Sequence, residues 1–162
     1  MLAMDAIGPT ISSFLREKLY ESVVEAMEPI GFMEVEYSED EVPYNMGVER
    51  IRVDILVEAP FPGEIRLIIP RDLGMEVTGN LHSFDSKEVT TKQLSDLLAE
   101  VLNVIAGRFM SKIVSPAIPF KIGLPSLGQN VFLSTQASQA TFHFEMEGKP
   151  FWVVLVGEGF FR

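Results

Sequence analysis

The segment TTKQLSDLLAEVLNVIAGRFMSKI, residues 90–113, is the longest amphipathic stretch of the chain and decides its predicted architecture. An α-helix turns about 100° per residue, so the apolar residues of this segment fall on one broad arc of roughly 180°. The prolines that follow predict its end. We therefore expect a helix that buries one face, and the arc consists of Leu97, Leu98, Val101, Leu102, Val104, Ile105, Phe109 and Ile113.

The opposite face of this helix carries a narrow polar strip. Asp96, Glu100, Asn103 and Gly107 are spaced i, i+4, i+7 and i+11, which places them on one line roughly 60° wide. Asn and Gly are poor helix formers, costing roughly 0.5–1 kcal/mol each relative to Ala. The strip is either a plain solvated face or a docking surface. In the second case a carboxylate, an amide and a bare patch would meet another backbone or a water.

The rest of the chain predicts helices and strands in an irregular order. Further helices are expected at residues 9–28 and 71–79, and strands at 32–37, 49–58, 64–69, 141–146 and 151–157. Pro29 and Gly31 predict the end of the first helix, and Gly79 and Asn80 the end of the second. This order favours an α+β fold, a mostly antiparallel sheet with helices packed against it. Its two similar halves also suggest an internal duplication.

Two hairpins are predicted within the sheet. Residues 49–58 place Ile51, Val53 and Ile55 on one face and Arg52 and Asp54 on the other, a pattern typical of a half-buried strand. A turn at residues 60–63 joins this strand to the next. A second tight turn, at residues 147–150, joins the last two strands.

Composition limits the class of protein. The 162 residues suit a single domain, residues 1–162, and include no cysteine. With 23 acidic and 13 basic residues the net charge is −10, which disfavours nucleic acid and anionic membranes as partners. The charge either keeps the domain soluble or favours a partner with a basic rim. With neither a signal peptide nor a membrane span, a cytoplasmic location is expected.

The usual chemistry of an active site is missing from the sequence. The two histidines, His82 and His143, lie in different predicted elements and lack metal-ligand spacing. His143 alternates with Phe142 and Phe144 and is expected on a strand face. Neither a phosphate-binding loop nor a dinucleotide glycine fingerprint occurs, so no metal site and no cofactor is predicted.

The polar strip resembles the active-site helix of the CheC/CheX/FliY chemotaxis phosphatases. Their motif is Asp or Ser, three residues, Glu, two residues, Asn, and a proline roughly twenty residues further on. Asp96, Glu100 and Asn103 match it without gaps, and Pro125 follows 22 positions after Asn103. Gly107 also recurs at its position in that family. The order of elements, including the GEIRLIIP strand, agrees as well.

Two departures from the family pattern refine this resemblance. The first helix has no second Glu-x-x-Asn, because Val24 follows three residues after Glu21, which implies a one-site CheX-type member. The residue before the Asn is usually small in the family, but here it is Leu102. Leu102 lies at the edge of the apolar arc, so it either packs inward or crowds the docking surface.

The resemblance implies a protein-aspartate phosphatase that accelerates dephosphorylation of a CheY-like response regulator. Asn103 would orient the attacking water, and Glu100 would pair with a lysine of the regulator. Asp96 would contact the partner or brace the helix, and Gly107 would lie at the partner contact. The regulator would supply Mg²⁺ and the acyl phosphate, so the chain would need no cofactor of its own. The resemblance also implies a homodimer formed through the sheet.

Two other functions remain open on the sequence. The first is a non-catalytic CheX-like module that binds a response regulator or a flagellar switch component. The second is an unrelated enzyme with a pocket elsewhere, which the lack of His, Cys and metal clusters disfavours.

Overall fold

A computed structural model describes residues 12–31, 33–38, 49–83, 85–128 and 138–162. Its centre is a six-stranded sheet in the order β1-β5-β6-β3-β2-β4, with every neighbouring pair antiparallel. The strands are β1 (Val35–Tyr37), β2 (Arg50–Ala59), β3 (Gly63–Pro70), β4 (Lys121–Ile122), β5 (Gln139–Met146) and β6 (Lys149–Val156). The prediction of a mixed fold with a mostly antiparallel sheet is confirmed.

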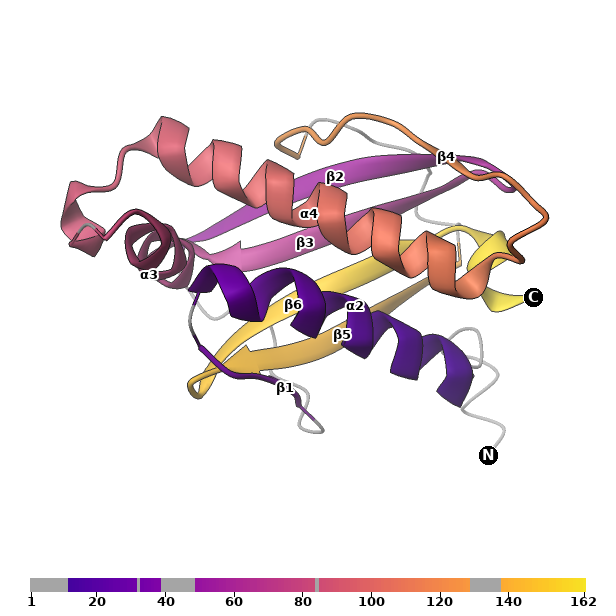
Figure 1. The fold of residues 1–162 in the computed structure, drawn as a ribbon, viewed down its shortest axis with the longest axis horizontal. Helices are drawn as coiled ribbons and strands as arrows, with labels where there is room; N and C mark the ends of the chain where they lie inside the picture. Colours follow the sequence, from indigo (N-terminus) through magenta and orange to yellow (C-terminus); the bar gives the residue numbers. More distant parts are fainter. Residues whose placement is uncertain (1–11, 32, 39–48, 84, 129–137) are drawn as a thin grey trace.

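Three helices pack against this sheet (Figure 1). They are α2 (Ser13–Gly31), α3 (Arg71–His82) and α4 (Thr91–Ile113), and two short 3-10 helices, η1 (Ser86–Glu88) and η2 (Glu158–Phe161), complete the described elements. Helices α2 and α4 lie next to each other and α3 contacts both, while α4 also contacts β2 and β3. The buried faces of helices and sheet form one hydrophobic core.

The long helix and the two predicted hairpins are confirmed. Thr90 is the N-cap of α4 and forms a capping box with Gln93, which satisfies donors at the start of the helix. β2 and β3 pair from Arg50↔Pro70 to Val57↔Gly63. In the β5–β6 turn, Glu147 and Gly148 have φ values of 51° and 78°, as a two-residue type I′ hairpin requires.

Other predicted boundaries differ by a few residues. Helix α2 ends at Gly31, one of the two predicted stop residues, but it includes Pro29, because a proline so near the end interrupts only the last turn. Gly79 and Asn80 do not end α3, which continues to His82 and stops where Ser83 adopts a left-handed conformation. The first strand is three residues long. Residues 9–11, 32 and 39–42, to which a helix start, a strand start and an acidic loop were assigned, lie outside the described part.

The strand order has an internal symmetry. It reads the same backwards when β1 is exchanged with β4, β2 with β5, and β3 with β6. Helix α2 precedes β1, and helix α4 precedes β4. A duplicated unit of one helix and three strands would produce this order, so the topology is compatible with the duplication, which stays a prediction.

The strand face that points away from the helices contains two buried carboxylates, which the alternation of β2 did not predict. Asp54 and Glu64 are both fully buried. Arg52 donates to Asp54 at 2.9 Å, Arg66 donates to Glu64 at 3.0 Å, and Asp54 stands directly opposite Arg66. The prediction of a half-buried strand is confirmed, because Val53, Ile55 and Val57 are buried while Arg52, Leu56 and Glu58 keep part of their surface exposed. Alternation shows which residues share a face but did not show that Asp54 would be buried.

Burial changes the pKa of Asp54. It raises the pKa of this carboxyl above the ordinary value of 3.8, and the hydrogen bond from Arg52 only partly opposes the shift. A carboxyl whose pKa is raised on folding favours the folded state while it is protonated. This stabilisation is fully present below the unfolded-state pKa and is lost as pH rises through the folded-state pKa. Ionised Asp54 is thus a cost at neutral pH.

We predict that Asp54→Asn, which copies the neutral carboxyl, gains stability relative to the parent as pH rises from about 4 to about 7. Urea unfolding of both proteins at the two pH values measures this difference. Glu17→Gln, at an exposed carboxylate of α2, is the matched control and should show no such trend. A difference for Asp54→Asn that does not change with pH contradicts the prediction.

Candidate functional site: an exposed face of helix α4

Helix α4 presents the predicted polar strip to solvent. Asp96, Glu100 and Asn103 are exposed, and Gly107 is partly exposed. The predicted apolar arc lies inward, although Val104 and Ile113 at its margins are only partly buried. The fully buried part of the helix face is Leu94, Leu97, Leu98, Val101, Leu102, Ile105, Ala106, Phe109 and Met110. The four strip residues therefore share one outward-facing line.

Leu102 packs into the core. Its side chain is 0% exposed, although its neighbour Asn103 is exposed. Successive residues of a helix are about 100° apart, so a residue at the edge of the apolar arc can turn inward while the next one faces water. Of the two alternatives for this departure from the family pattern, inward packing holds. A large side chain at position 102 does not crowd the strip.

Two side chains of the strip, Glu100 and Asn103, are unpaired among the described residues. Within the described ranges, neither side chain makes a hydrogen bond or an ion pair. Asp96 differs, because Lys92 lies one turn earlier and places its Nζ 2.7 Å from Asp96 Oδ2. The sequence analysis missed Lys92, and its i, i+4 spacing to Asp96 was the signal that could have found it. Glu100 is thus the carboxylate of the strip that is free to pair with another protein.

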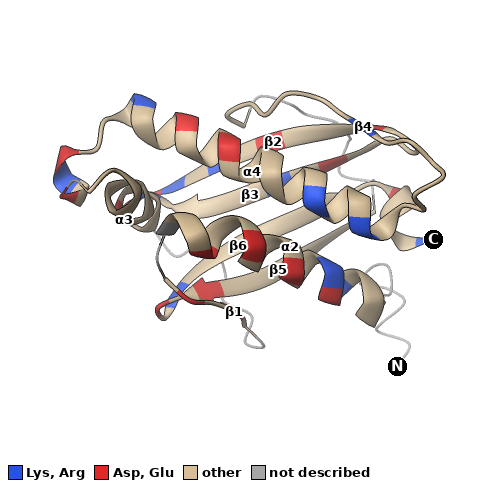
Figure 2. Cartoon of the chain, in the orientation of Figure 1, with Lys and Arg blue, Asp and Glu red and all other residues tan. Residues whose placement is uncertain are grey.

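The basic half of α4 is already occupied. Figure 2 shows that, after a basic residue in its first turn, the helix carries acidic residues in its first half and basic residues in its second. Arg108 lies 3.3 Å from Glu25 of α2, and Lys112 lies 3.2 Å from Glu25 and 3.3 Å from Glu21. Hydrogen bonds from Lys18 and Lys112 hold the pKa of Glu21 below its ordinary value, so it stays ionised. These pairs join α2 to α4 and leave the acidic half open.

Gly107 leaves an open patch on the strip. A Cβ placed there would meet nothing within 4 Å. Neither packing nor a left-handed backbone requires glycine at this position. A helix interior normally disfavours it by roughly 1 kcal/mol relative to Ala, so no feature of the described fold explains the glycine.

Pro125 lies in a segment that follows the outer edge of the sheet. Gly123 donates to the carbonyl of Leu56 at 2.8 Å, and Ser126 pairs with Asp54 through two backbone hydrogen bonds of 2.7 and 2.8 Å. Residues 121–128 thus run along β2, the strand that α4 contacts. Pro125, the proline of the family motif, therefore lies in the segment next to β2, and β2 in turn contacts α4.

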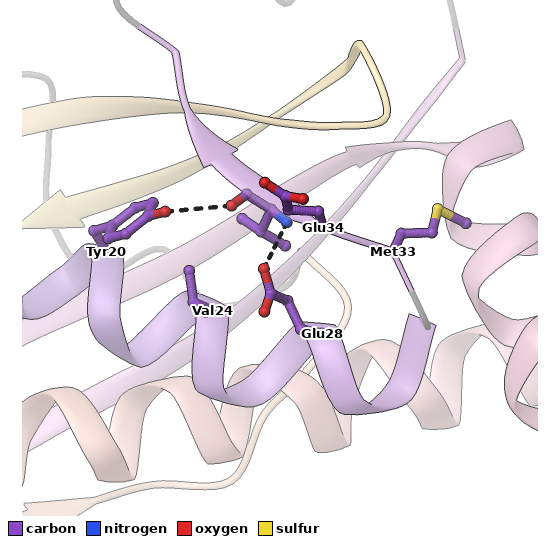
Figure 3. A pocket seen from close by; sticks show the side chains of 6 residues that line it. Tyr20, Val24, Glu28, Met33 and Glu34 are labelled. Atoms are coloured by element: carbon purple, nitrogen blue, oxygen red, sulfur yellow. Dashed lines mark hydrogen bonds between the residues drawn. The ribbon is translucent and has the colours of Figure 1, made fainter.

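Helix α2 does not offer an equivalent surface. A hollow of about 560 Å³ lies between α2 and β1, and Figure 3 shows how its polar groups are used. Glu28 accepts the backbone N–H of Val35 at 2.9 Å, and the Tyr20 hydroxyl donates to the carbonyl of Val35 at 3.4 Å. Both outward-facing backbone groups of Val35 on this edge strand are thus satisfied. Since Glu21 and Glu25 are also paired, α2 has no free carboxylate–amide pair at this spacing.

Outside the strip, the described residues contain neither a cluster that could hold a metal ion nor a helix that could span a membrane. No group of three or more His, Asp or Glu side chains in those ranges could hold a metal ion. His82 lies at the end of α3, and His143 lies half-buried on β5 as expected for a strand-face residue. None of the described helices is long and apolar enough to span a membrane.

Solved structures define the class of fold. A CheX chemotaxis protein from Desulfovibrio desulfuricans matches with a TM-score of 0.69 and 13% identity, over 87% of this chain and 97% of that one. A CheX from Borrelia burgdorferi, solved as a CheX-CheY-BeF3-Mg+2 complex, matches with a TM-score of 0.70 and 18% identity, over 88% and 96%. FliY from Thermotoga maritima matches with a TM-score of 0.60 and 14% identity, over 88% and 85%. The fold is that of the CheX, CheC and FliY chemotaxis proteins.

The sequence identifies the family within this class. The family model described as chemotaxis phosphatase CheX matches residues 55–146, more than half of the chain, including the whole polar strip. No curated protein matches the chain by sequence. The chain belongs to the CheX family of chemotaxis phosphatases.

The burial of Leu102 yields a prediction that separates its structural role from the site. Leu102→Ala should lower the free energy of unfolding by about 2–5 kcal/mol, because it removes core packing and leaves a cavity. Denaturant unfolding measures this loss. The exposed strip should keep its function below the new melting temperature. A loss of less than about 1 kcal/mol would mean that Leu102 contributes little to the core.

Proposed function

We propose that this chain is a CheX-type phosphatase that accelerates hydrolysis of the phospho-aspartate of a CheY-like response regulator. The observation that carries the proposal is that Glu100 and Asn103 are exposed and unpaired on one face of a single rigid helix. Family membership supports the reaction, and the Borrelia complex supports a CheY-like partner.

The roles proposed for the two residues follow from their chemistry. Asn103 carries a neutral amide that can donate one hydrogen bond and accept another. Placed in the regulator's active site, it would orient a water for attack on phosphorus. The bond between phosphorus and the aspartate oxygen would break, leaving free phosphate and the aspartate carboxylate. Catalysis of this kind consists of positioning and electrostatics and needs no nucleophile from the phosphatase.

Glu100 would fix how the two proteins dock. A carboxylate one turn before Asn103 can pair with a lysine at the regulator's phosphorylation site, and such a pair sets orientation more than affinity. Asp96 would lie at the rim of the contact, with its charge shared with Lys92. Gly107 would let the partner approach the helix backbone closely.

The proposed reaction also needs groups that the regulator would supply. The regulator would bring Mg²⁺ and the acyl phosphate, and the phosphatase would work without a cofactor of its own. We propose a homodimer formed through the sheet and a cytoplasmic location, both on the family resemblance.

Replacement of Asn103 tests the catalytic role. We predict that Asn103→Ala lowers the acceleration of dephosphorylation by roughly 10²-fold or more, since the water loses its orienting group. The side chain is exposed, so unfolding curves should change little. Release of phosphate from a CheY-like regulator phosphorylated with acetyl phosphate measures the effect. Gln139→Ala, at an exposed amide on β5, is the control.

Two results would contradict this assignment. If Asn103→Ala still accelerates phosphate release as the parent does, Asn103 is not the water-orienting group. If the parent binds the phosphorylated regulator without accelerating its dephosphorylation, the chain is a non-catalytic binding module.

Replacement of Glu100 tests the docking role. Glu100→Gln keeps the size of the side chain and removes its charge, so it should raise KM for the phosphorylated regulator by roughly tenfold. The effect should shrink at high salt, because screening weakens the ion pair in both proteins. Glu17→Gln makes the same charge change on α2 and should leave KM unchanged. Equal KM values for the two variants would exclude Glu100 from docking.

A further inference from the structure

The polar strip of α4 contains one arrangement of positions twice, one helical turn apart. Glu100 is followed by Asn103 after three residues and by Gly107 after seven. Asp96 is followed at the same two intervals by Ala99 and Asn103. A step of four residues is about 6 Å along a helix axis and about 40° around it. Each carboxylate therefore offers a partner a similar line of positions, but only Glu100 is followed by an amide at the first interval.

This repetition gives the regulator two ways to dock. Under the proposed function, on which this inference rests, a lysine of the regulator pairs with Glu100 while Asn103 meets the attacking water. If the same lysine paired with Asp96, the regulator would lie about 6 Å nearer the start of α4, and Ala99 would occupy the place at the water. A methyl group neither donates nor accepts a hydrogen bond. The displaced complex would therefore form without accelerating hydrolysis.

Lys92 makes the two carboxylates of the strip unequal. Its Nζ donates a hydrogen bond to Asp96 Oδ2 at 2.7 Å. No lysine or arginine lies three or four residues from Glu100 in either direction, and its carboxylate is unpaired within the described ranges. A lysine of the regulator must displace Lys92 to pair with Asp96, whereas at Glu100 it meets no competing cation. The productive way of docking is favoured for this reason.

The stability of α4 does not account for a lysine at this position. Lys92 is the second residue of the helix, whose first turn has no acidic residue, and the helix dipole disfavours a cation there. At i, i+4 spacing, a base that precedes its acid also stabilises a helix less than the reverse order. Both side chains of the pair are largely exposed, and such pairs add little to stability. The pair instead decides which carboxylate of the strip is open to a partner.

We propose that Lys92 is a positioning residue that fixes where the regulator docks along α4. By holding Asp96, it leaves Glu100 as the open carboxylate of the strip and so brings Asn103, and not Ala99, to the reacting water. Lys92 is about 16 Å along the helix axis from Asn103, so it acts through Asp96 and does not touch the reacting atoms. Glu100 supplies the productive contact, and Lys92 removes the competing one.

Replacement of Lys92 by glutamine tests the proposal. Lys92→Gln keeps a long polar side chain but frees Asp96, so part of the bound regulator should lie in the displaced position. Both kcat and KM should then fall roughly two- to threefold, the size of an exposed ion pair. The ratio kcat/KM should not change, because it compares the transition state with the free proteins. Phosphate release from a CheY-like regulator phosphorylated with acetyl phosphate, at low ionic strength, measures both constants.

Two further variants show whether Lys92 acts through Asp96. Adding Asp96→Asn to Lys92→Gln removes the competing carboxylate, so kcat should rise again toward the parental value. Lys87→Gln removes the charge of another exposed lysine, on η1, and should leave kcat and KM unchanged. The difference between Lys92→Gln and the parent should shrink at high salt, because screening weakens both competing pairs. Circular dichroism of each variant shows that it is folded.

The outcomes separate this inference from the proposed function. Parental kcat and KM in Lys92→Gln would overturn the positioning role. So would a raised KM at constant kcat, which would mean that Lys92 contacts the regulator directly, or a kcat that does not recover when Asp96→Asn is added. In these three cases the phosphatase stands if the parent accelerates dephosphorylation and Asn103→Ala does not. A parent that fails to accelerate dephosphorylation would overturn the proposed function, and this inference with it.

Discussion

The burial of one face of α4 against the sheet is the constraint on which the rest of the structure depends. Leu94, Leu98, Leu102, Ile105 and Phe109 are all at most 1% exposed. A buried side chain of this size contributes roughly 1.5–3 kcal/mol, so together they outweigh any local preference of the polar residues. Rotation of the helix by one residue, about 100°, would carry these groups toward water and turn the strip toward the core. The outward direction of Glu100 and Asn103 is therefore a result of packing.

Helix α2 completes this arrangement by taking up the positive charge of α4. Glu21 and Glu25 pair with Lys112 and Arg108, and both helices rest on the same core. If these cations were free, they would compete for the carboxylates on the exposed face or repel a partner's lysine. Because they are held to α2, Glu100 remains an unpaired negative charge beside a neutral amide. The structural ion pairs thus define the electrostatics of the site although they lie outside it.

The sequence predicted the elements with strong periodicity and the line of polar residues on α4. This succeeded because helical geometry turns the spacing of Asp96, Glu100, Asn103 and Gly107 directly into a position on a surface. Prediction from the sequence failed where burial or a helix end depended on contacts with distant parts of the chain. Nothing local shows that Asp54 of β2 is buried.

The terminal turns of helices were missed for a related reason. Pro29 and Gly79 are helix breakers by local preference, yet both lie within helices. Gly79 is buried, and Gly74, five residues earlier, is packed so closely that a Cβ there would meet Leu94 at 2.9 Å. Tertiary packing of α3 against α4 therefore overrides the propensity of single residues. Gly74 serves close helix contact, and Gly79 does not end the helix.

Gly107 differs from the glycines of α3, because no packing contact requires a glycine there. Its backbone is ordinary helix and a Cβ there would meet nothing, so an alanine would fit and favour the helix by roughly 1 kcal/mol. The same holds in weaker form for Asn103, which is exposed and bonded to nothing described. Two poor helix formers stand on a face where the fold does not need them. Under the proposed function, a partner protein with its own acyl phosphate would require both a close approach to the helix and an amide.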